Sequence, residues 1–455
     1  MAAGEELTFP GTSGHVDPLP LEAATAPVER RLLPMTATVD ERDRLSVGGV
    51  DLVDAAEEFG TPLFVYDEAH LRARCREAVD AWGEGVAYAT KAFLCRAMAR
   101  LAVEEGMCLD VSTGGELHVA RHAGVDPARL VLHGNNKSDE ELATALELGV
   151  GRIVVDSFDE VDRIERLAGP GAGRATRPPQ VLVRVTPGVE VHTHEFVRTG
   201  QDDSKFGFGL ASGAADRAVD RLSELTRRGV VELVGVHAHL GSQVFALAPF
   251  TRAVELLARF FAPLGLPELV VGGGLGVPYV TGESAPSLGE WAAAVRQACD
   301  AAGLPAGVRV TAEPGRAIVA GAAVTLYRVG TVKHVSGHRT YVAVDGGMSD
   351  NPRPVLYGSG YEAFLPRATS APRPFSVRIV GKHCETGDLL VPEGFVPADL
   401  EVGDVLATPV TGAYGHSMAS NYNKVPRPAV VFAAGGEARV VVRRETLDDL
   451  VRHDE

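Results

Sequence analysis

Eight runs rich in β-branched and apolar residues recur between residues 86 and 312, and stretches with helical periodicity separate them. The runs span residues 86–90, 108–112, 130–134, 152–157, 181–187, 234–240, 269–273 and 308–312. Strands that alternate with helices favour a parallel sheet covered by helices. Eight such units in succession predict an α/β fold of the (β/α)8, TIM-like barrel type.

Polar or glycine residues stand where these predicted strands end. They are Lys91, Asp110, His133, Asp156, Arg184, His239, Gly272 and Glu313. The carboxyl ends of barrel strands all lie on one face, and barrel enzymes build their active sites there. The sequence therefore predicts an active site assembled from these strand ends.

Beyond Arg316 the helical stretches give way to strand-like segments at residues 323–335, 341–344, 376–380 and 429–432. We therefore predict three regions. These are a loosely ordered arm at 1–40, rich in Ala, Pro and Gly, a barrel at 41–318, and a mostly β domain at 319–455. A long Gly- and Asp-rich connection runs from Gly188 to Phe208 and contains His192-Thr193-His194, and its length predicts a mobile lid.

Composition narrows the possible partners. The formal net charge of −16 argues against nucleic acid or an anionic membrane surface as the main partner. The five cysteines are scattered without a Cys-x-x-Cys pair, which is typical of reduced thiols. The first residues lack the basic start and apolar segment of a secretion signal, and no run of about 18 apolar residues occurs. We expect a cytoplasmic protein.

Lys91 directly follows the strand-like run Val-Ala-Tyr-Ala-Thr at residues 86–90, within the segment Val-Ala-Tyr-Ala-Thr-Lys-Ala-Phe at residues 86–93. A lysine packed against apolar neighbours loses its proton more readily, and a neutral amine condenses with a carbonyl substrate or with pyridoxal phosphate. The alternative is a solvated lysine at the end of a strand.

Two motifs follow the last predicted barrel strands. Glu313-Pro314-Gly315-Arg316 supplies a carboxylate that could keep a pyridine nitrogen protonated, although Pro-Gly is also ordinary turn sequence. Residues 272–276, Gly-Gly-Gly-Leu-Gly, would let backbone amides approach a phosphate at a helix N-terminus.

His237 and His239 lie two residues apart, hence on one face of a strand. Three interpretations remain open: metal ligands, with His192 and His194 recruited to the same site, a histidine buried by packing, or an imidazole stacked on a cofactor ring. The sequence holds no His-Glu-x-x-His motif or cysteine cluster, so we predict no metal site.

The second domain contains two further candidates. Cys384 and Glu385 stand in a polar, Gly-flanked loop that suits a proton donor better than a buried thiol. Arg353 and Tyr357 could clamp a carboxylate, because a guanidinium gives two parallel hydrogen bonds. Residues 412–423 suggest no chemistry by their spacing alone.

Taken in order, these motifs resemble diaminopimelate decarboxylases, which belong to the alanine-racemase-like (fold type III) class of pyridoxal phosphate enzymes. The motifs are Tyr-Ala-Thr-Lys-Ala-Phe, His-Ala-His-Leu-Gly-Ser-Gln, Gly-Gly-Gly-Leu-Gly, Glu-Pro-Gly-Arg, Cys-Glu-Thr-Gly-Asp and Gly-Ala-Tyr followed by Ser-Met-Ala-Ser-Asn-Tyr-Asn. The resemblance covers roughly residues 45–450. It departs from the family's commonest wording at Val-Thr-Pro-Gly, residues 185–188, and at Gly-Lys-His before Cys384, which bears on loop geometry rather than on the reaction.

The resemblance implies a role for each candidate. Lys91 would hold the cofactor covalently, His239 would stack on its ring, and Glu313 would pair with its ring nitrogen. The cofactor-binding set would be Lys91, Asp110, His239, Ser242, Gly273, Gly274, Glu313, Gly315, Arg316 and Tyr414, with Arg184 near the ring. The substrate-binding set would be Arg316, Arg353, Tyr357, Glu385 and Tyr414.

The resemblance also implies an obligate homodimer with shared active sites, in which Cys384 of one subunit protonates and Glu385 receives the distal ammonium. The reaction would be decarboxylation of meso-2,6-diaminopimelate to L-lysine and carbon dioxide, the last step of lysine biosynthesis. The nearest alternative is a decarboxylase of ornithine, arginine or carboxynorspermidine, and a racemase or a non-catalytic pyridoxal phosphate-binding homologue is a further one. Arg353 favours a substrate with a distal carboxylate.

Overall fold

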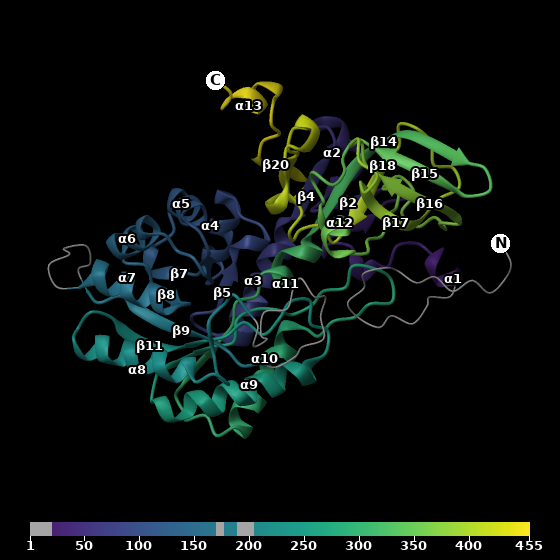
Figure 1. Cartoon of the computed structure of the whole chain (residues 1–455). Coiled ribbons are helices and arrows are strands. Elements are labelled where there is room, and N and C mark those ends of the chain that lie inside the picture. Colours follow the sequence, from purple (N-terminus) through teal and green to yellow (C-terminus); the bar gives the residue numbers. More distant parts are fainter. Residues whose placement is uncertain (1–20, 170–176, 189–203) are drawn as a thin grey trace. The chain divides into compact units, whose positions relative to one another are not determined.

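A computed structural model describes residues 21–169, 177–188 and 204–455, and the chain divides into two compact units (Figure 1). We name residues 75–276 and 285–317 the barrel unit. The β unit contains residues up to Arg74 together with 277–284 and 318–455. The predicted lid, with His192 and His194, lies largely in residues 189–203, outside the described ranges.

The barrel unit is built on eight parallel strands whose order in the sheet follows the chain. They are β5 (Ala87–Ala89), β6 (Cys108–Val111), β7 (Leu130–Leu132), β8 (Arg152–Val155), β9 (Gln180–Thr186), β11 (Glu232–His237), β12 (Glu268–Val270) and β13 (Arg309–Thr311). A short strand, β10 (Phe208–Gly209), pairs with β9. The predicted α/β fold with eight parallel strands is confirmed.

The first and last strands of this sheet are joined by backbone hydrogen bonds. The N–H of Ala87 donates to the carbonyl of Ala312 at 3.1 Å, and that of Ala89 donates to Pro314 at 3.2 Å. Six strands each contribute one buried apolar residue to a common core, namely Ala87, Val131, Val154, Leu182, Val234 and Val270. The interior is therefore packed with side chains, as in other barrels of this size.

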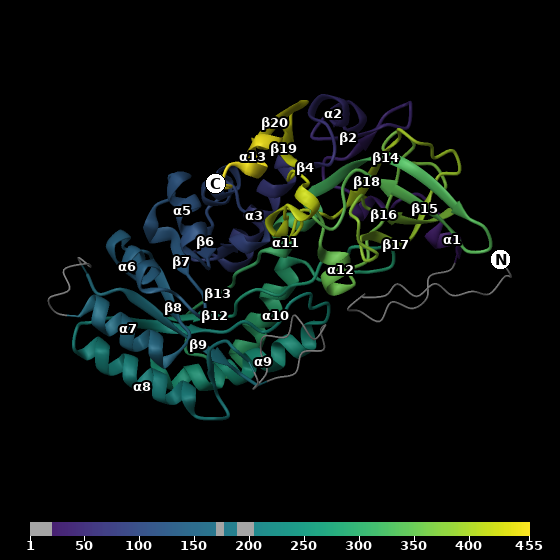
Figure 2. The same ribbon diagram turned by 45° about the horizontal axis from the view of Figure 1, so that its top comes forward.

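Helices cover the outside of these strands, as Figure 2 shows for α6 to α9. The barrel-unit helices are α4 (Arg96–Glu104), α5 (Gly114–His122), α6 (Asp139–Leu148), α7 (Phe158–Ala168), α8 (Ala214–Arg227), α9 (Leu247–Phe261) and α10 (Leu288–Ala301), while α3 (Glu68–Trp82) spans the unit boundary. Helix α6 illustrates the local signals. Ser138 and Glu141 form a capping box, three acidic residues fill the first turn, and Gly149 ends the helix at φ +67°.

The β unit contains a small sheet of β1 (Thr38–Val39), β2 (Leu45–Val47) and β3 (Val50–Asp51), and a larger sheet in the order β17-β16-β15-β14-β4-β19-β20, with β18 paired to β14. The larger sheet comprises β4 (Leu63–Asp67), β14 (Ala323–Val335), β15 (Arg339–Val344), β16 (Phe375–Val380), β17 (Leu389–Val396), β18 (Val405–Pro409), β19 (Ala429–Ala434) and β20 (Glu437–Val442). Its helices are short: α1 (Leu21–Ala24), α2 (Leu52–Phe59), α11 (Arg316–Val319, at the unit boundary), α12 (Arg353–Tyr357) and α13 (Leu447–Val451).

The observed division of the chain agrees with the predicted boundary at 318 but differs from the predicted boundary at 40. Strand β4 pairs with β14 and β19, so residues 41–74 belong to the β unit rather than to the barrel. Residues 21–40 of the predicted loose arm also pack there. Leu32 and Leu33 are buried, and Arg373 donates to the carbonyl of Ala26. Strand β4 precedes the first predicted barrel strand at residue 86, and its long-range pairing assigns it to the β unit.

None of the helices in the described ranges combines the length and the apolar character that crossing a bilayer requires.

Candidate active site

The strand ends of the barrel unit bring together most of the polar residues that the sequence singled out. Lys91 lies in a short 3₁₀ turn, Thr90–Ala92, directly after β5, and Asp110 lies in β6. His133 follows β7, His237 ends β11, and Glu313 follows β13. Because the strands are parallel, all of these groups stand at one end of the barrel.

The environment of Lys91 bears on its two interpretations. Its neighbours Thr90 and Ala92 are buried, but Lys91 itself is exposed. Of the two interpretations of Lys91, the structure agrees with a solvated residue at the end of a strand, because the 3₁₀ turn directs the residue out of the strand. The amine is accessible to a carbonyl compound.

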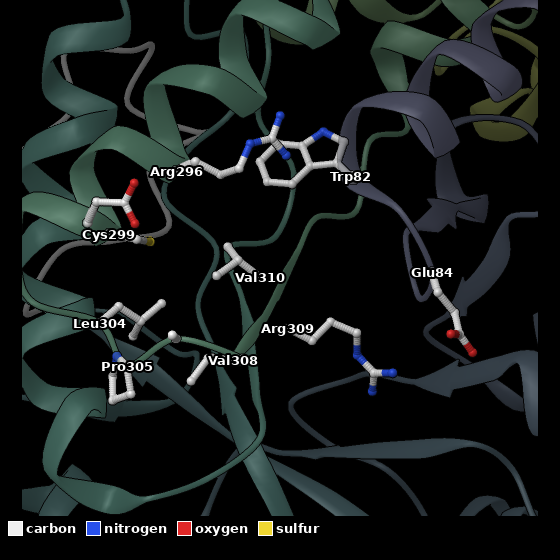
Figure 3. A pocket seen from close by; sticks show the side chains of 12 residues that line it. Trp82, Glu84, Arg296, Cys299, Leu304, Pro305, Val308, Arg309 and Val310 are labelled. Carbon is white, nitrogen blue, oxygen red and sulfur yellow. The ribbon is translucent and has the colours of Figure 1, made fainter.

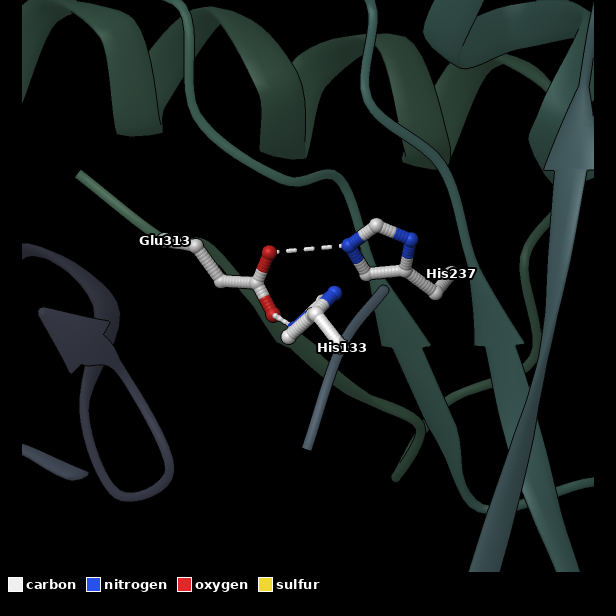
Figure 4. Close-up of side chains that lie close together, drawn as sticks. All are labelled: His133, His237 and Glu313. Carbon is white, nitrogen blue, oxygen red and sulfur yellow. Dashed lines mark hydrogen bonds and ion pairs between the residues drawn. The ribbon is translucent and has the colours of Figure 1, made fainter. Parts of the chain in front are cut away.

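Glu313 is the centre of a buried cluster (Figure 4). Its Oε1 accepts a hydrogen bond from His133 Nε2 at 2.9 Å, and its Oε2 accepts one from His237 Nε2 at 2.8 Å. His133 Nε2 also lies 3.7 Å from Asp110 Oδ1, which is buried without a hydrogen-bond partner. The four groups form one electrostatic unit.

The pKa values in this cluster separate in a way that burial and charge explain. Burial would raise the pKa of Glu313, but His133 and His237 outweigh burial and hold that pKa well below its usual range. Burial raises the pKa of Asp110 to about 6. Burial would lower the pKa of His133, but Asp110 and Glu313 outweigh it and the pKa is raised. Burial lowers the pKa of His237 to about 4.

His239 lies two residues beyond β11 and is half-buried. Burial lowers its pKa well below the usual value, and its Nδ1 accepts a hydrogen bond from the N–H of Gly273 at 3.2 Å. The ring is therefore neutral, with its proton on Nε2. A neutral, oriented imidazole suits stacking on a flat ring better than coordination of a metal through Nδ1.

The glycine run at 272–276 does not open a helix, contrary to prediction. The next helix, α10, begins only at Leu288, after the chain has passed through residues 277–284 of the β unit. The glycines are instead required by close packing of loops. Gly274 adopts φ +118°, and a Cβ there would lie 2.5 Å from the carbonyl of Gly241. Backbone amides still line this loop, and Gly273 N–H already bonds His239.

Ser242 and Arg316 meet at the same end of the barrel unit, where Arg316 Nη2 donates to Ser242 Oγ at 3.0 Å. Gly315 precedes Arg316, and a Cβ at Gly315 would lie 2.9 Å from the carbonyl of Ala89. This contact holds the Glu313 segment tightly against β5, the strand that leads to Lys91. Ser242, a predicted cofactor-binding residue, is thus a neighbour of Arg316, which was predicted to bind both cofactor and substrate.

Arg184 is already paired in the structure. Its Nη1 lies 3.3 Å from Asp156 Oδ2, and its guanidinium stacks on Phe206 at 4.3 Å from the ring centroid. Arg184 therefore contributes a positive charge at this end of the barrel, and its two contacts fix the orientation of its side chain.

Arg353 opens α12 in the β unit and is 4% exposed. Its Nη1 donates to the Tyr361 hydroxyl at 2.7 Å, and its guanidinium lies 4.3 Å from the centroid of the Tyr279 ring. Its Nε is buried without a hydrogen-bond partner. Among the described residues, no carboxylate lies within the 4.0 Å of an ion pair with Arg353. A buried cation without a carboxylate partner has the capacity to bind an anion.

The other predicted residues of the β unit are more open. Tyr357, four residues after Arg353 on α12, is half-buried, as is Tyr414, which adopts φ +59°. Cys384 and Glu385 are both exposed, in agreement with a loop position.

The segment that gave no chemical signal in the sequence holds the Cys384 loop. Cys384 N–H donates to Asn423 Oδ1 at 3.1 Å, and the Tyr422 hydroxyl lies 3.4 Å from Glu385 Oε2. His383 donates its backbone N–H to Asp388 Oδ2, and its ring lies 5.5 Å from that of Tyr422. Asn423 adopts φ +51°, a left-handed conformation that asparagine tolerates better than most residues other than glycine. Positive φ is invisible in the sequence, so spacing alone could not identify this segment.

Sequence reasoning also passed over Tyr279 and Tyr361, and gave His133 no role beyond its strand-end position. His192 and His194, which the metal interpretation would recruit, lie outside the described residues. The donor atoms of His133, His237 and Glu313 lie within 4.8 Å of one another, close enough for a shared metal ion.

A groove of about 470 Å³ lies at the opposite, amino-terminal end of the barrel strands (Figure 3). Trp82, Cys299, Leu304 and Val310 line it together with Arg296 and Arg309. None of the predicted site residues borders it, and barrel enzymes do not place their chemistry at this end.

The residues of the barrel end fit pyridoxal phosphate. The accessible amine of Lys91 suits its aldehyde, and the neutral imidazole of His239 suits its ring face. The ionised carboxylate of Glu313 and the unpartnered buried oxygen of Asp110 suit its protonated ring nitrogen. The fold and this set of donors define the class: a pyridoxal phosphate-dependent barrel enzyme with a β domain.

Comparisons with known proteins agree. Residues 68–320 match the family model described as the pyridoxal binding domain of pyridoxal-dependent decarboxylases. The chain is 47% identical to the diaminopimelate decarboxylase of Mycobacterium tuberculosis H37Rv, over 92% of this chain and 96% of that one. The Bacillus subtilis enzyme of the same name is 43% identical over 92% of this chain and 97% of that one. The crystal structure of diaminopimelate decarboxylase from M. jannaschii with L-lysine matches with a TM-score of 0.83 and 30% identity, over 92% of this chain and 98% of that one. The chain belongs to the diaminopimelate decarboxylase family, and its cofactor is pyridoxal phosphate.

Proposed function

We propose that this protein decarboxylates meso-2,6-diaminopimelate to L-lysine and carbon dioxide, the last step of lysine biosynthesis. Relatives that share 42 to 47% of their residues with it carry this name, and the M. jannaschii structure contains L-lysine. Pyridoxal phosphate, when bound, takes up the electron pair left behind as carbon dioxide departs. The remaining work falls to the side chains of the protein.

In the barrel unit, Lys91 provides the amine that holds the cofactor, and its exposure leaves that amine free to react. Glu313 is a buried carboxylate that would pair with the ring nitrogen, and neutral His239 would pack on the ring face. Ser242 and Arg316, 3.0 Å apart, contribute to phosphate and substrate binding with Gly273, Gly274 and Gly315. Asp110 and Arg184 set the charge around the ring.

The observation that carries the substrate assignment is the buried Arg353 guanidinium. It has a free Nε donor and no ion-pair partner among the described residues, so a substrate carboxylate would supply the missing anion. The distal end of meso-diaminopimelate has such a carboxylate, whereas ornithine and arginine do not. Tyr357 and Tyr414 complete the binding of this end, and exposed Glu385 receives the distal ammonium.

We further propose a homodimer in which Cys384 and Glu385 act on substrate held by the barrel of the partner copy. Cys384 is an exposed free thiol and can give its proton to the carbon that has lost carbon dioxide. A mixture of Lys91→Ala and Cys384→Ala proteins should regain lysine-forming activity once subunits exchange. If activity stays absent despite proven exchange, Cys384 acts within its own subunit.

All five cysteines are free in the structure, which supports a reducing, cytoplasmic location as part of the proposal.

The first experiment is to add pyridoxal phosphate to the purified protein, record its visible absorbance, and assay lysine and carbon dioxide from meso-diaminopimelate. L-Ornithine and L-arginine serve as comparison substrates. The proposal requires turnover of meso-diaminopimelate in clear preference to both. Cofactor binding with turnover of ornithine instead would favour the related basic amino-acid decarboxylases, and Arg353 would then need another anion.

A further inference from the structure

Both oxygens of the Glu313 carboxylate are occupied by histidines. His133 Nε2 lies 2.9 Å from Oε1 and His237 Nε2 lies 2.8 Å from Oε2, and all three residues are at most 6% exposed. A carboxylate only accepts hydrogen bonds, so both Nε2 atoms carry the proton and donate. The two bonds fix where the carboxylate points.

The two histidines differ in charge. The pKa of His237 is lowered to about 4 by burial, so it is neutral, with its proton on Nε2 and a bare Nδ1. His133 faces two carboxylates, Glu313 at 2.9 Å and Asp110 at 3.7 Å, and these raise its pKa above the usual value. Of the two histidines, His133 is therefore the one whose surroundings favour a positive charge.

Counting charges shows what the cluster lacks. Asp110 and Glu313 contribute two negative charges when both are ionised, and His133 contributes at most one positive charge, so at least one negative charge is left in a buried place. Lys91, Arg184, Glu116 and neutral His239 are the other titratable groups that act on its members. Lys91 and Arg184 have their own tasks, with the cofactor and Asp156 respectively. A protonated ring nitrogen beside Glu313 would balance the remaining charge.

We propose that His133 and His237 are positioning residues, which clamp Glu313 as an oriented carboxylate so that the ring nitrogen of bound pyridoxal phosphate keeps its proton. This inference rests on the proposed function, because it takes Glu313 as the partner of the ring nitrogen. The physical reason is relative basicity. Two N–H donors weaken Glu313 as a base, so the shared proton stays on the ring rather than moving to the carboxylate.

The test uses a cofactor analogue that removes only the ring nitrogen. In 1-deazapyridoxal phosphate a C–H group replaces that nitrogen, while the aldehyde and the phosphate remain. Dissociation constants of the natural cofactor and the analogue are measured on the apoprotein by equilibrium dialysis. Their ratio reports the contribution of the ring nitrogen without any need for turnover.

His237 offers a matched pair of variants. His237→Leu removes the donor to Glu313 Oε2, and His237→Gln keeps an amide N–H near the same position. Without this donor the Glu313 carboxylate can turn away from the ring nitrogen, and loss of that one charged hydrogen bond should reduce the preference for the natural cofactor about ten- to hundredfold in the leucine variant. The glutamine variant should recover most of it. His133→Leu and His133→Gln repeat the test at Oε1, so one unfolded variant leaves the other pair informative.

The outcomes separate the inference from the function it builds on. A preference that is unchanged in both leucine variants, with binding otherwise normal, overturns the clamp but leaves the decarboxylase proposal standing. Failure of the wild-type protein to bind pyridoxal phosphate overturns both. Stoichiometric binding of zinc that His237→Leu abolishes, and that excludes the natural cofactor, would overturn the clamp and make the three residues a metal site.

Discussion

Two buried arginines in the β unit, Arg373 and Arg353, are alike in burial and opposite in their partners. Arg373 donates to Glu362 Oε2 at 2.8 Å and to the carbonyls of Ala26 and Ala363 at 2.7 and 3.0 Å. Arg353 has a tyrosine hydroxyl and an aromatic ring but no carboxylate among the described residues. A compensated buried charge holds the fold together, whereas an uncompensated one marks a place where a ligand completes the structure.

Tyr279 and Tyr361 make the uncompensated charge tolerable. The guanidinium lies 4.3 Å from the centroid of Tyr279 and 5.7 Å from that of Tyr361, and the faces of aromatic rings attract cations. This attraction is weaker than an ion pair in the same surroundings, so capacity for an anion remains.

The largest expected effect is on the compensated side of the comparison. Arg373→Met leaves Glu362 charged and buried, and breaking such a pair destabilises a protein by about 3 to 5 kcal/mol. Urea denaturation should show this loss. The double variant Arg373→Met, Glu362→Gln should recover part of it, because no unpaired charge is left. A single variant as stable as the wild type would end the distinction between the two arginines.

Arg353→Met should behave in the opposite way. Removing an uncompensated buried cation should leave the stability of the ligand-free protein unchanged or raised. The value of kcat/KM for meso-diaminopimelate should fall by about 30-fold to several thousandfold, which corresponds to the roughly 2 to 5 kcal/mol of a truncated buried charge pair. Cofactor affinity, measured by dialysis, is the control and should not change. A stability loss similar to that of Arg373→Met would show that Arg353 is structural.

In the barrel unit, the cost of a buried charge can be measured by changing the pH, because His237 is buried in its neutral form. His237 has a folded-state pKa of about 4, below its unfolded value of 6.5, so the unfolded chain binds more protons between these values. Stability contributed by neutral His237 is full above pH 6.5 and is lost as the pH falls towards 4, by at most roughly 3 kcal/mol. Urea denaturation of the apoprotein across this range should therefore be less pH-dependent for His237→Gln. Parallel curves for the two proteins would show that His237 is not held neutral.

The smallest expected effect concerns the Cys384 loop. Asn423→Ala removes the acceptor of the Cys384 N–H in an exposed region, so stability should change by less than about 1 kcal/mol. Turnover should fall by roughly 2- to 10-fold if this bond orients the thiol. Asn423→Asp, which keeps an acceptor oxygen, is the matched control. Equal loss in both variants would assign the effect to the loop conformation rather than to the hydrogen bond.

Much of the barrel could be predicted because its signals are local. The runs at 108–112 and 130–134 coincide with β6 and β7 within two residues, since β-branched alternation with helices is a property of neighbouring positions. The position of Lys91, Asp110, His239 and Glu313 at one end of the barrel could be predicted because the carboxyl ends of parallel strands lie on one face.

The parts that could not be predicted depend on residues far apart in the chain. Tyr279 comes from residues 277–284, between two barrel elements, yet its ring lies under Arg353. The backbone N–H groups of Tyr279 and Thr281 donate to Glu283 and Glu362, which fixes this segment in the β unit. Nothing in the sequence near Tyr279 indicates a partner more than 70 positions away. The choice between a packed and a solvated Lys91 stayed open for a related reason, because apolar neighbours indicate a strand and not the turn that ends it.

The excursion at 277–284 has a consequence for how such a protein can be divided and inherited. The chain passes between the two units at residues 74/75, 276/277, 284/285 and 317/318, so no single cut separates them. A gene fragment that encodes only the carboxy-terminal strands would lack both β4 and the ring beneath Arg353. Recombination that replaced residues 318–455 alone would bring in a new residue at position 353 but would retain Tyr279 of the original chain. Exchange of the carboxy-terminal segment alone would therefore separate Arg353 from the tyrosine that evolved beside it.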